Sequence, residues 1–596
     1  MSNKVSVSVN KKASNRSSQP TSTAWRYYVV LAIVALIYAG LLARSAYIQI
    51  IEPEMLKKQG DMRSMRVAAN TVQRGSIIDR NGDELAISVP VETVWADPKI
   101  IMDNDALAMT EHWQALADVL GQDVSKLTTR VVRSPTKRFV YLERKISPAM
   151  ANYIRELKIP GIHLRKESKR FYPTGEISAH IVGFTNVDDK GIEGVERVYD
   201  QLLTGKGGSK RFRKDAKGRK IEILSVEASQ EAKNVTLTID QRIQAIAYKE
   251  LKGAVQAFKA TSGSVVVADI HTGEILAMAN SPSYNPNNRR NTAIHRFRNR
   301  AITDVYEPGS TMKPLTALTA LEFGSAKTNT VIDTSPGWMR LGGRRVNDPI
   351  NRGKLSIEDI LVTSSNMGTT KLALSVPKNF LLDKFFDAGF ADDTGTDLVG
   401  ESSGMMHDRP RWSKFELATL SWGYGLAITP MQLARFYAAL ANGGIKRELS
   451  IVKTEKINEG VRIFSEENAI AVTSMLENVV DEHVQKAKVD GYRVGGKTGT
   501  SFKAVAGGYG NDYVGLFAGV APISDPKVVV VVVINDPGGD LYHGGEVAAP
   551  VFSRVMKGAL RVLNIMPDAN KQLAKSHVLR TTVVEANLSA LEADDV

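Results

Sequence analysis

The feature that most constrains this chain is a single long apolar run close to its N-terminus. From Tyr27 to Ala43 there are 17 consecutive uncharged, mainly apolar residues, and Arg44 closes the run. The preceding residues 1–26 are polar and basic, with no acidic residue. The run is slightly shorter than the about 20 residues that span a bilayer, but flanking arginines reach back to the interfaces. We therefore predict a transmembrane anchor over residues 27–48, preceded by a tail at 1–26.

Two other interpretations of this run are weaker. A cleaved signal peptide needs small residues at its cleavage site, and no convincing A-x-A pattern follows the run. A buried core helix does not explain why a basic tail precedes the run at the N-terminus. The excess of positive charge before the run predicts a cytoplasmic tail, with everything after about residue 50 across the membrane.

Composition narrows the remaining choices. A chain of 596 residues is too long for one hydrophobic core and predicts more than one domain. It has no cysteine, which excludes disulfides, thiolate metal sites and cysteine nucleophiles. The net charge of +13 admits nucleic acid or an anionic membrane surface as partner. We expect no nucleic acid, because zinc-finger spacing, a basic heptad region and RNA-binding aromatic signatures are all missing.

Two folded blocks are expected after the anchor. Residues 60–230 are mixed in pattern and rich in charge. Within them Asn81-Gly82 predicts a hairpin turn, and residues 194–203 have the apolar spacing of a helix.

The second block, residues 235–566, carries strands at both ends and helices between them. The expected strands are 264–269, 274–279, 492–500, 513–520 and 528–534, and the helical middle runs from about 310 to 480. This order predicts an α+β fold, in which the first and last segments form an antiparallel sheet. The polar residues 567–596 are expected to form a loosely held tail.

The best candidate nucleophile lies between Val305 and Leu321. Pro308-Gly309 predicts a turn, and leucines at helical spacing follow. Ser310 therefore lies near a helix N-terminus, with Lys313 on the same face one turn later. A hydroxyl beside backbone N–H groups and an amine makes a serine nucleophile without histidine.

The Ser-x-x-Lys spacing does not by itself identify a site. It also occurs at Ser8/Lys11, Ser134/Lys137, Ser375/Lys378, Ser450/Lys453 and Ser524/Lys527. Any single copy is better explained as a capping serine followed by a surface lysine. Ser310 has to be distinguished by other residues of the chain.

Two further motifs provide that distinction. Ser364-Ser365-Asn366 lies between helical stretches, and Lys497-Thr498-Gly499 lies on the strand that begins near Tyr492. Ser-x-Asn is weak alone, whereas Lys-Thr-Gly occurs once in the chain. The order Ser-x-x-Lys, Ser-x-Asn, Lys-Thr-Gly is the combination found in penicillin-binding proteins and class A β-lactamases.

One competing motif overlaps the third. Gly491 to Thr498 formally matches the phosphate-binding loop G-x-x-x-x-G-K-[ST]. That loop needs a preceding strand and a helix directly after it, and glycine-rich sequence follows here instead. The nine histidines form no H-E-x-x-H pair, and no Gly-x-Ser-x-Gly elbow occurs. We expect no metal and no cofactor.

At this point the chain resembles the class B penicillin-binding proteins, the serine D,D-transpeptidases that cross-link peptidoglycan. The resemblance covers nearly the whole chain, including residues 74–82, 191–205, 298–310 and 421–435. Asp61–Arg66 and Ile534–Pro537 resemble the branch of the family that acts in cell division.

The resemblance implies an architecture and a set of partners. It implies a transpeptidase domain on an elongated pedestal of the dimerisation type, anchored in the bacterial inner membrane with the catalytic domain in the periplasm. The implied ligands are stem peptides ending in D-Ala-D-Ala and β-lactam antibiotics. The implied protein partners belong to the division machinery and include a polytopic glycosyltransferase.

The resemblance also implies catalytic roles. Ser310 would attack the carbonyl between two D-alanines, and a neutral Lys313 would take its proton, since a lysine among cations and apolar walls has a lowered pKa. Ser364 and Lys497 would pass the proton to the departing D-alanine. Asn366 would bind the amide of the substrate.

Substrate binding is assigned in the same way to the Lys-Thr-Gly strand. The hydroxyls of Thr498 and Thr500, on either side of Gly499, would hold the terminal carboxylate together with Lys497. The N–H groups of Ser310 and Thr500 would form the oxyanion hole.

Other functions share part of this pattern. A β-lactamase, an antibiotic sensor or a carboxypeptidase would use the same three motifs, and the elongation-type class B transpeptidase is the alternative among cross-linking enzymes. A division scaffold with a vestigial enzyme domain belongs to a different class, which the intact motifs disfavour.

Overall fold

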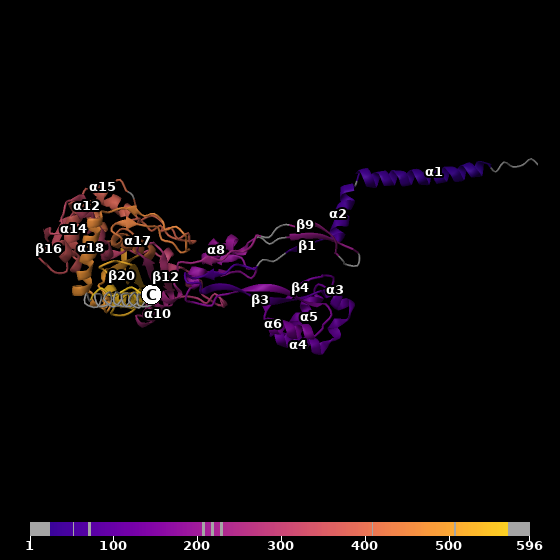
Figure 1. The fold of residues 1–596 in the computed structure, drawn as a ribbon, viewed down its shortest axis with the longest axis horizontal. Helices are drawn as coiled ribbons and strands as arrows, with labels where there is room; N and C mark the ends of the chain where they lie inside the picture. Colours follow the sequence, from indigo (N-terminus) through magenta and orange to yellow (C-terminus); the bar gives the residue numbers. More distant parts are fainter. Residues whose placement is uncertain are drawn as a thin grey trace, which may run out of the picture. The chain divides into compact units, whose positions relative to one another are not determined.

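The computed structural model describes residues 24–51, 53–69, 73–205, 209–215, 220–226, 230–407, 409–505 and 508–569. Most of the two predicted tails, 1–26 and 567–596, lies outside these ranges. The chain forms two compact units, one from Met1–Thr71 with Gly207–Gln230 and one from Val72–Lys206 with Glu231–Val596 (Figure 1). The predicted domain limits at residues 60, 230, 235 and 566 stay predictions.

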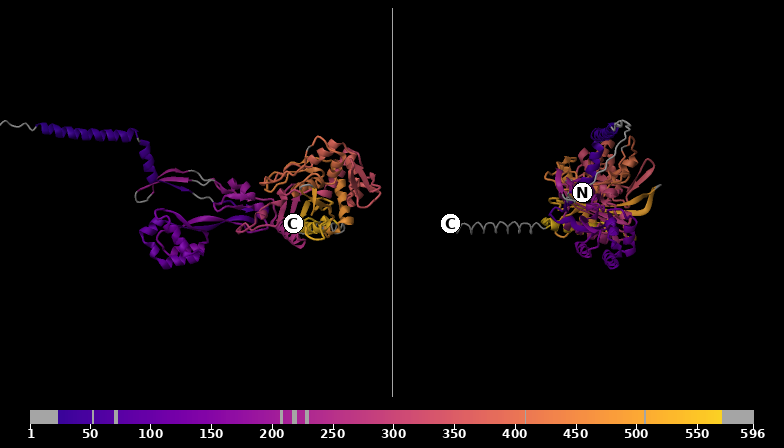
Figure 2. Two further views of the ribbon diagram at one scale, coloured as in Figure 1. Left: turned by 180° about the vertical axis from the view of Figure 1, so that it is seen from behind. Right: turned by 90° about the vertical axis from the view of Figure 1, so that its right-hand side faces the viewer.

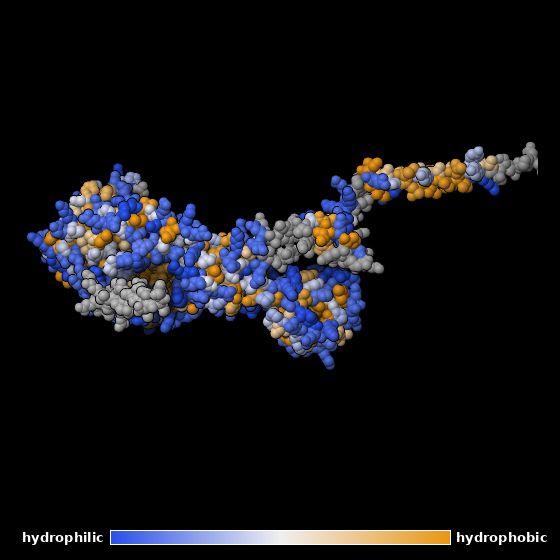
Figure 3. Space-filling view, viewed as in Figure 1, coloured by the Kyte–Doolittle hydropathy of each residue, from blue (hydrophilic) through white to orange (hydrophobic). Residues whose placement is uncertain are grey.

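The first unit contains the predicted anchor. Helix α1 spans Ala24–Ala46, with no buried residue, and continues through a short π-helical turn at Tyr47–Ile51. Its 23 residues correspond to a length of about 35 Å, against about 30 Å for the hydrocarbon core of a bilayer. Its surface is almost entirely apolar in Figure 3. Helix α1 therefore fits a single-pass membrane anchor.

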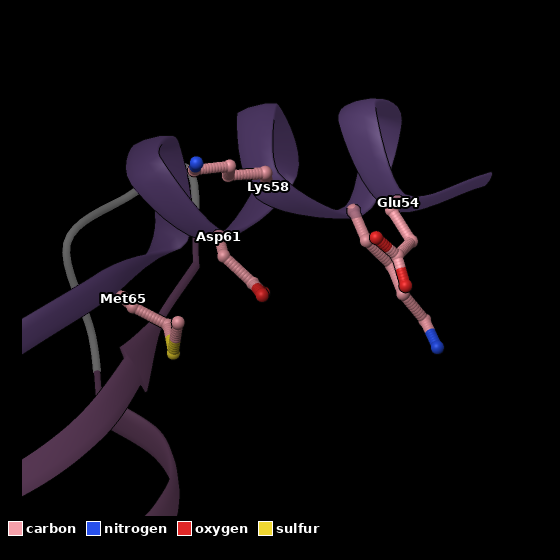
Figure 4. Close-up of a pocket in the computed structure, with 5 residues that line it drawn as sticks. Glu54, Lys58, Asp61 and Met65 are labelled. Carbon is pink, nitrogen blue, oxygen red and sulfur yellow. The ribbon is translucent and has the colours of Figure 1, made fainter. Parts of the chain in front are cut away.

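The rest of the first unit is a helix and a small sheet. Helix α2, Pro53–Ser64, leads into strand β1, which pairs with β8, and β8 pairs with β9, both antiparallel. These strands are β1 Met65–Ala69, β8 Ser209–Lys214 and β9 Lys220–Val226. A hollow of about 440 Å³ beside α2 is lined by Glu54, Lys57, Lys58, Asp61 and Met65 (Figure 4). Asp61 lies 3.8 Å from Arg213, so this ion pair links α2 to β8.

The second unit begins with a sheet built around one long strand. The strand order is β10-β2-β3-β4, and β5 pairs with β3 as well. The bounds are β2 Ile77–Ile78, β3 Glu84–Ala96, β4 Val140–Ile146, β5 Ile162–Phe171 and β10 Val235–Thr236. The turn predicted at Asn81-Gly82 is confirmed, because β2 and β3 pair antiparallel around it and Gly82 has a φ of +96°.

Four helices lie beside this sheet (Figures 1 and 2), and their buried side chains form a separate small core with it. They are α3 Pro98–Asp103, α4 Thr110–Leu120, α5 Val124–Val132 and α6 Pro148–Glu156. Their buried apolar faces meet around Trp113, Leu116 and Leu127. This core explains how the charge-rich segment folds without a long apolar run.

Two buried arginines share one carboxylate in this region. Glu196 has 0% exposure and lies 2.6 Å from both Arg74 Nη2 and Arg170 Nε. The helix predicted over 194–203 is confirmed except at Tyr199, where it is interrupted and divides into α8 Gly194–Val198 and α9 Asp200–Thr204. Asp200, the first residue of α9, forms an ion pair with Arg74 at 2.7 Å. Short elements nearby are α7 Ala179–Val182, β6 Phe184–Thr185 and β7 Gly191–Glu193.

The remainder of the second unit is organised on a five-stranded antiparallel sheet of order β12-β11-β21-β20-β19. The strands are β11 Ser262–Asp269, β12 Ile275–Ser281, β19 Gly495–Val505, β20 Gly508–Ala521 and β21 Val528–Asn535. The first and last segments of the block thus form one sheet, as predicted. Every residue of β21 is buried, so both faces of the sheet are covered.

Helices supply that cover. Helices α10, Gln241–Ala257, and α20, Ala549–Val562, contact each other on one face, and α17, Pro430–Ala441, packs against β11, β20 and β21. The predicted helix start at Thr429-Pro430 is confirmed, since Thr429 caps α17 through Gln432 N–H.

A helical part lies between the strands in sequence. Its helices are α11 Arg300–Thr303, α12 Lys313–Phe323, α13 Ile357–Val362, α14 Asn366–Leu374, α15 Lys378–Asp387, α16 Lys414–Ser421 and α18 Glu466–Asn478. Three two-stranded antiparallel sheets complete it, formed by β13 Val331–Asp333 with β16 Lys354–Ser356, β14 Trp338–Leu341 with β15 Arg344–Asn347, and β17 Ile445–Lys446 with β18 Val461–Arg462. Helix α19, Gly544–Val547, follows the last strand of the sheet. The α+β class predicted from the sequence is confirmed.

Candidate active site

Ser310 lies on a tight turn that opens a buried helix. Gly309–Met312 form a 3₁₀ turn, η4, and α12 begins at Lys313. Gly309 has a φ of +56°, a conformation that glycine adopts at little cost, and donates its N–H to Gly423 O at 3.0 Å. A Cβ on Gly423 would lie 2.1 Å from Gly309 O, so the two backbones touch. The turn that carries Ser310 is thereby fixed against the backbone of Gly423.

Lys313 is buried and points at the second motif. Its side chain has 1% exposure, and its Nζ bonds to Ser364 O, to Ser364 Oγ at 3.1 Å and to Asn366 Oδ1 at 2.8 Å. A neutral amine satisfies this arrangement by donating to the two carbonyl oxygens and accepting from the Ser364 hydroxyl. Among the Ser-x-x-Lys copies in the described ranges, Lys313 is the one buried lysine.

The surroundings of Lys313 disfavour its charged form. Burial holds the pKa of the Lys313 amine well below its ordinary value, and the positive charge of Lys497 lowers it further. The negative charge of Asp348 opposes both effects. The balance leaves an amine that is poised to act as a base.

Ser364 and Asn366 lie at the junction of two helices. Ser364 follows α13 and has a φ of +56°, which is uncommon for a residue with a side chain. Ser365 caps α14 by accepting from Gly368 N–H at 2.9 Å. This strained turn directs Ser364 and Asn366 toward the amine of Lys313.

The junction depends on Asp348, which the motifs did not point to. Asp348 Oδ1 accepts from Asn366 N–H at 2.6 Å and from Met367 N–H at 3.0 Å, and Oδ2 accepts from the Ser365 hydroxyl. Asp348 directly follows β15 and belongs to none of the three motifs, so its role becomes visible only in the folded structure.

Lys497 is the second buried amine of the site. It lies on β19 with 0% exposure, and within the described part of the chain Nζ has no hydrogen-bond partner. Burial lowers the pKa of Lys497 to about 8. A buried polar group without a partner is uncommon and indicates a missing ligand or a functional role.

The rest of the third motif alternates along β19. Thr498 and Thr500 line a cavity on one side, whereas Gly499 faces the nucleophile turn. A Cβ on Gly499 would lie 2.5 Å from Pro308 O, so only glycine permits this approach. Thr500 Oγ1 accepts from Gly544 N–H at 3.0 Å, and the backbone of the strand lies against the turn that carries Ser310.

The cavity beside Thr498 and Thr500 has a volume of about 700 Å³. Its other lining residues are Glu482, His483, Val484, Gln485, Lys486, His543, Gly545 and Glu546. They come from the end of the π-helical turn Val479–His483, the 3₁₀ turn Gln485–Ala487 and helix α19. We refer to this space as the side cavity.

Glu307 is a further residue that the sequence patterns missed. Its Oε1 accepts from Gly425 N–H at 2.8 Å and from the Tyr509 hydroxyl at 3.2 Å. Burial raises the pKa of Glu307, although both hydrogen bonds oppose the rise. Glu307 thus ties the segment before Ser310 to two neighbouring segments.

The structure excludes the phosphate-binding loop. The residues after Lys497 continue as strand β19, so no helix N-terminus stands where phosphate would bind. Across the described ranges, no group of three or more histidine, aspartate and glutamate side chains is placed to hold a metal ion.

Two family models match the chain. The penicillin-binding protein transpeptidase domain matches residues 263–557, and the penicillin-binding protein dimerisation domain matches residues 69–237. The first range includes all three motifs. Both matches describe one class of protein, a penicillin-binding protein with a transpeptidase domain and a separate dimerisation region.

Curated relatives resemble the chain over nearly its whole length. Peptidoglycan D,D-transpeptidase FtsI of Escherichia coli K12 is 48% identical, covering 92% of this chain and 93% of the relative. FtsI of Buchnera aphidicola subsp. Schizaphis graminum is 40% identical, covering 91% and 96%. The chain belongs to the class B penicillin-binding proteins.

Solved structures agree. A peptidoglycan synthetase from Bifidobacterium adolescentis has a TM-score of 0.69 at 25% identity, covering 85% of this chain and 98% of that one. The transpeptidase domain of penicillin-binding protein 3 from Burkholderia pseudomallei has a TM-score of 0.52 at 37% identity, covering 56% of this chain and 98% of that one.

Proposed function

We propose that this protein is a D,D-transpeptidase that cross-links the stem peptides of septal peptidoglycan through an acyl-enzyme on Ser310. The observation that carries the proposal is the buried amine of Lys313, which bonds to Ser364 and Asn366 one helical turn from Ser310. The transpeptidase family model and the FtsI relatives support the same reaction.

Acylation follows from these positions. Neutral Lys313 takes the proton of Ser310 as the hydroxyl oxygen attacks the carbonyl carbon between the two D-alanines. The proton then passes through Ser364, with Lys497 nearby, to the nitrogen of the departing D-alanine. Asn366 holds the amide of the donor peptide.

Charge recognition accompanies this chemistry. The hydroxyls of Thr498 and Thr500 and the unpartnered amine of Lys497 bind the terminal carboxylate of the donor. The N–H groups of Ser310 and Thr500 stabilise the tetrahedral oxyanion, and loss of one such donor typically costs about 10²–10³ in rate. The close approach of Gly309 to Thr500 supports this pairing of backbones.

β-Lactams acylate the same serine in this proposal, which provides the direct test. Ser310→Ala should abolish covalent labelling by a fluorescent penicillin. Ser375→Ala, which changes the serine of another Ser-x-x-Lys copy, is the matched control and should label normally. Labelling that persists in Ser310→Ala would contradict the assignment of the nucleophile.

The proposed arrangement in the cell uses the predicted limits. Residues 1–26 form a cytoplasmic tail, 27–48 the anchor, 60–230 the pedestal, 235–566 the periplasmic transpeptidase domain and 567–596 a C-terminal tail. The basic residues before the apolar run support this orientation in the inner membrane. A reporter enzyme that is active only after export should be active when fused to the C-terminus. Activity of a C-terminal reporter that works only in the cytoplasm would contradict the proposed orientation.

We also propose that the protein works at the septum with division proteins, including a polytopic glycosyltransferase. The identity to the FtsI relatives favours this over the elongation-type enzyme. A fluorescent fusion should concentrate at the septum, and side-wall localisation would favour the elongation type. A Ser310→Ala protein that still supported division would favour a mainly scaffolding role.

A further inference from the structure

The side cavity has a size and chemistry that the acylation step leaves unexplained. Its volume of about 700 Å³ falls within the usual range of small-ligand sites, about 300–1,000 Å³. A departing D-alanine would fill only a small part of it. The cavity borders Thr498 and Thr500, so a ligand there lies next to the proposed carboxylate site.

The proposed reaction needs a second ligand at this place. After D-alanine has left, an amine of another stem peptide must reach the acyl carbon. An aliphatic amine is an ammonium ion at neutral pH and has no lone pair for attack. A cavity that binds such a ligand should therefore carry negative charge, which attracts the ammonium group, and a base that can remove its proton.

The lining residues meet both requirements. Glu482 and Glu546 line the cavity, and their negative charges favour an entering ammonium group; Glu546 Oε2 also accepts from His543 N–H at 3.3 Å in the cap of α19. His483 lies on the same wall, and removal of water from around its ring lowers its pKa, helped by the positive charges of Lys497 and Arg352. His483 is therefore neutral at physiological pH and can accept a proton. The other charged or titratable groups at the wall are Lys486 and His543.

We propose that the side cavity binds the acceptor amine of the second stem peptide, and that His483 removes the proton that keeps this amine from attacking. This inference rests on the proposed transpeptidase function. It adds a binding site for the acceptor and a catalytic residue for the second half of the reaction.

The step balances as follows. The ammonium group gives one proton to His483, which later releases it to solvent. The free amine then forms a bond to the acyl carbon, and the bond between that carbon and Ser310 Oγ breaks. A second proton passes from the amine nitrogen through Lys313 to Ser310 Oγ, which restores the starting enzyme and leaves a new amide.

A partition experiment tests the proposal with the full-length protein in detergent. The protein is acylated by a D-alanyl thioester in the presence of D-alanine, and the ratio of amide product to hydrolysis product is measured. Both products arise from one acyl-enzyme, so any effect on acylation cancels from the ratio. His483→Gln should lower the ratio at least about tenfold, since general base catalysis typically contributes about 10²–10⁴. His271→Gln, a histidine outside the cavity, is the matched control.

Hydroxylamine separates proton removal from a structural effect. It is already unprotonated at neutral pH, so His483→Gln should leave its partition ratio near the wild-type value. Equal losses with D-alanine and hydroxylamine, or no loss with either, would overturn the role of His483. Absence of penicillin labelling in the wild type would instead refute the proposed function on which the inference rests.

A second variant tests the cavity itself. A Cβ on Gly545 would lie 3.5 Å from Thr498 Cγ2 and 3.7 Å from Val484 Cγ1, which is ordinary contact. Gly545→Val therefore narrows the cavity without a clash at Cβ. It should raise the half-saturating concentration of a peptide amine acceptor several-fold more than that of hydroxylamine. If the half-saturating concentration of the peptide amine is unchanged in Gly545→Val, the acceptor binds outside the side cavity.

Discussion

Replacement of Asp348 by asparagine changes the stability and the pH dependence of the site in a calculable way. The amide side chain keeps an oxygen for the N–H groups of Asn366 and Met367, but the carboxylate charge is lost. Hydrogen bonds to charged groups contribute about 1.5–3 kcal/mol and neutral ones about 0.5–1.5 kcal/mol. The Ser365 hydroxyl loses its carboxylate acceptor as well, so three weakened bonds predict a loss of about 3 kcal/mol in the free energy of unfolding for Asp348→Asn.

The same substitution moves the pKa of Lys313. The charge of Asp348 raises that pKa, against burial and Lys497, so its removal lowers the pKa further. In the proposed mechanism Lys313 acts as a base only when its amine is neutral, which is the case above its pKa. Acylation rises with pH as Lys313 loses its proton, and this rising limb should shift to lower pH in Asp348→Asn.

Two measurements check this prediction, urea unfolding and the rate of acylation by a fluorescent penicillin over a pH series. Asp359→Asn is the matched control, because Asp359 caps α13 through Ser356 but lies on an exposed surface. It should lose about 1 kcal/mol with no shift of the limb. If the pH at which the acylation rate rises is unchanged or higher in Asp348→Asn, the electrostatic argument is refuted.

Three further substitutions have defined outcomes. Gly499→Ala puts a Cβ 2.5 Å from a backbone oxygen and should slow penicillin acylation at least about tenfold. The control is Gly253→Ala, whose Cβ would have no other atom within 4 Å. It should leave the acylation rate unchanged and stabilise the protein by about 0.5–1 kcal/mol. Lys497→Met removes a charge that lowers the pKa of Lys313, so any residual acylation should show its rising limb at higher pH. The pKa of Lys497 falls from 10.5 to about 8 on folding, so the charged amine destabilises the folded state. Below pH 8 the methionine variant should therefore be more stable than the wild type by about 3 kcal/mol. This difference should vanish above about pH 10.5 in unfolding titrations. Glu196→Gln leaves buried Arg170 without a carboxylate, and Arg74 with Asp200 alone, and should cost about 3–5 kcal/mol in thermal unfolding.

Local patterns were sufficient where one stretch of chain determines its own structure. The turn at Pro308-Gly309 precedes the helix that carries Lys313, and Thr429-Pro430 starts α17, because caps and turns depend on neighbouring residues. The strands β11, β12 and β21 were equally visible as short β-branched runs. Their ends differ from the expected ones by a few residues.

Long-range partners could not be found in this way. Asp348 and Glu307 serve the site through contacts with residues far along the chain, and neither belongs to a motif. The break at Tyr199 is a tertiary effect as well, since apolar spacing alone favoured one continuous helix. The side cavity is lined by turns near residue 483 and by helix α19 near residue 545, which lie far apart in the sequence. No sequence pattern predicts that these segments are neighbours.

Within the described residues the amine of Lys497 has no hydrogen-bond partner, and we expect this amine to couple ligand binding to the proton concentration of the solvent. An anion that binds beside Nζ stabilises the ammonium form and raises a pKa that is otherwise about 8. Near that pH, each binding event therefore draws a fraction of a proton from solvent into the site. The donor carboxylate would in this way load the enzyme with the proton that the departing D-alanine later needs. Calorimetry in two buffers with different ionisation enthalpies would register this uptake as a difference in apparent binding enthalpy.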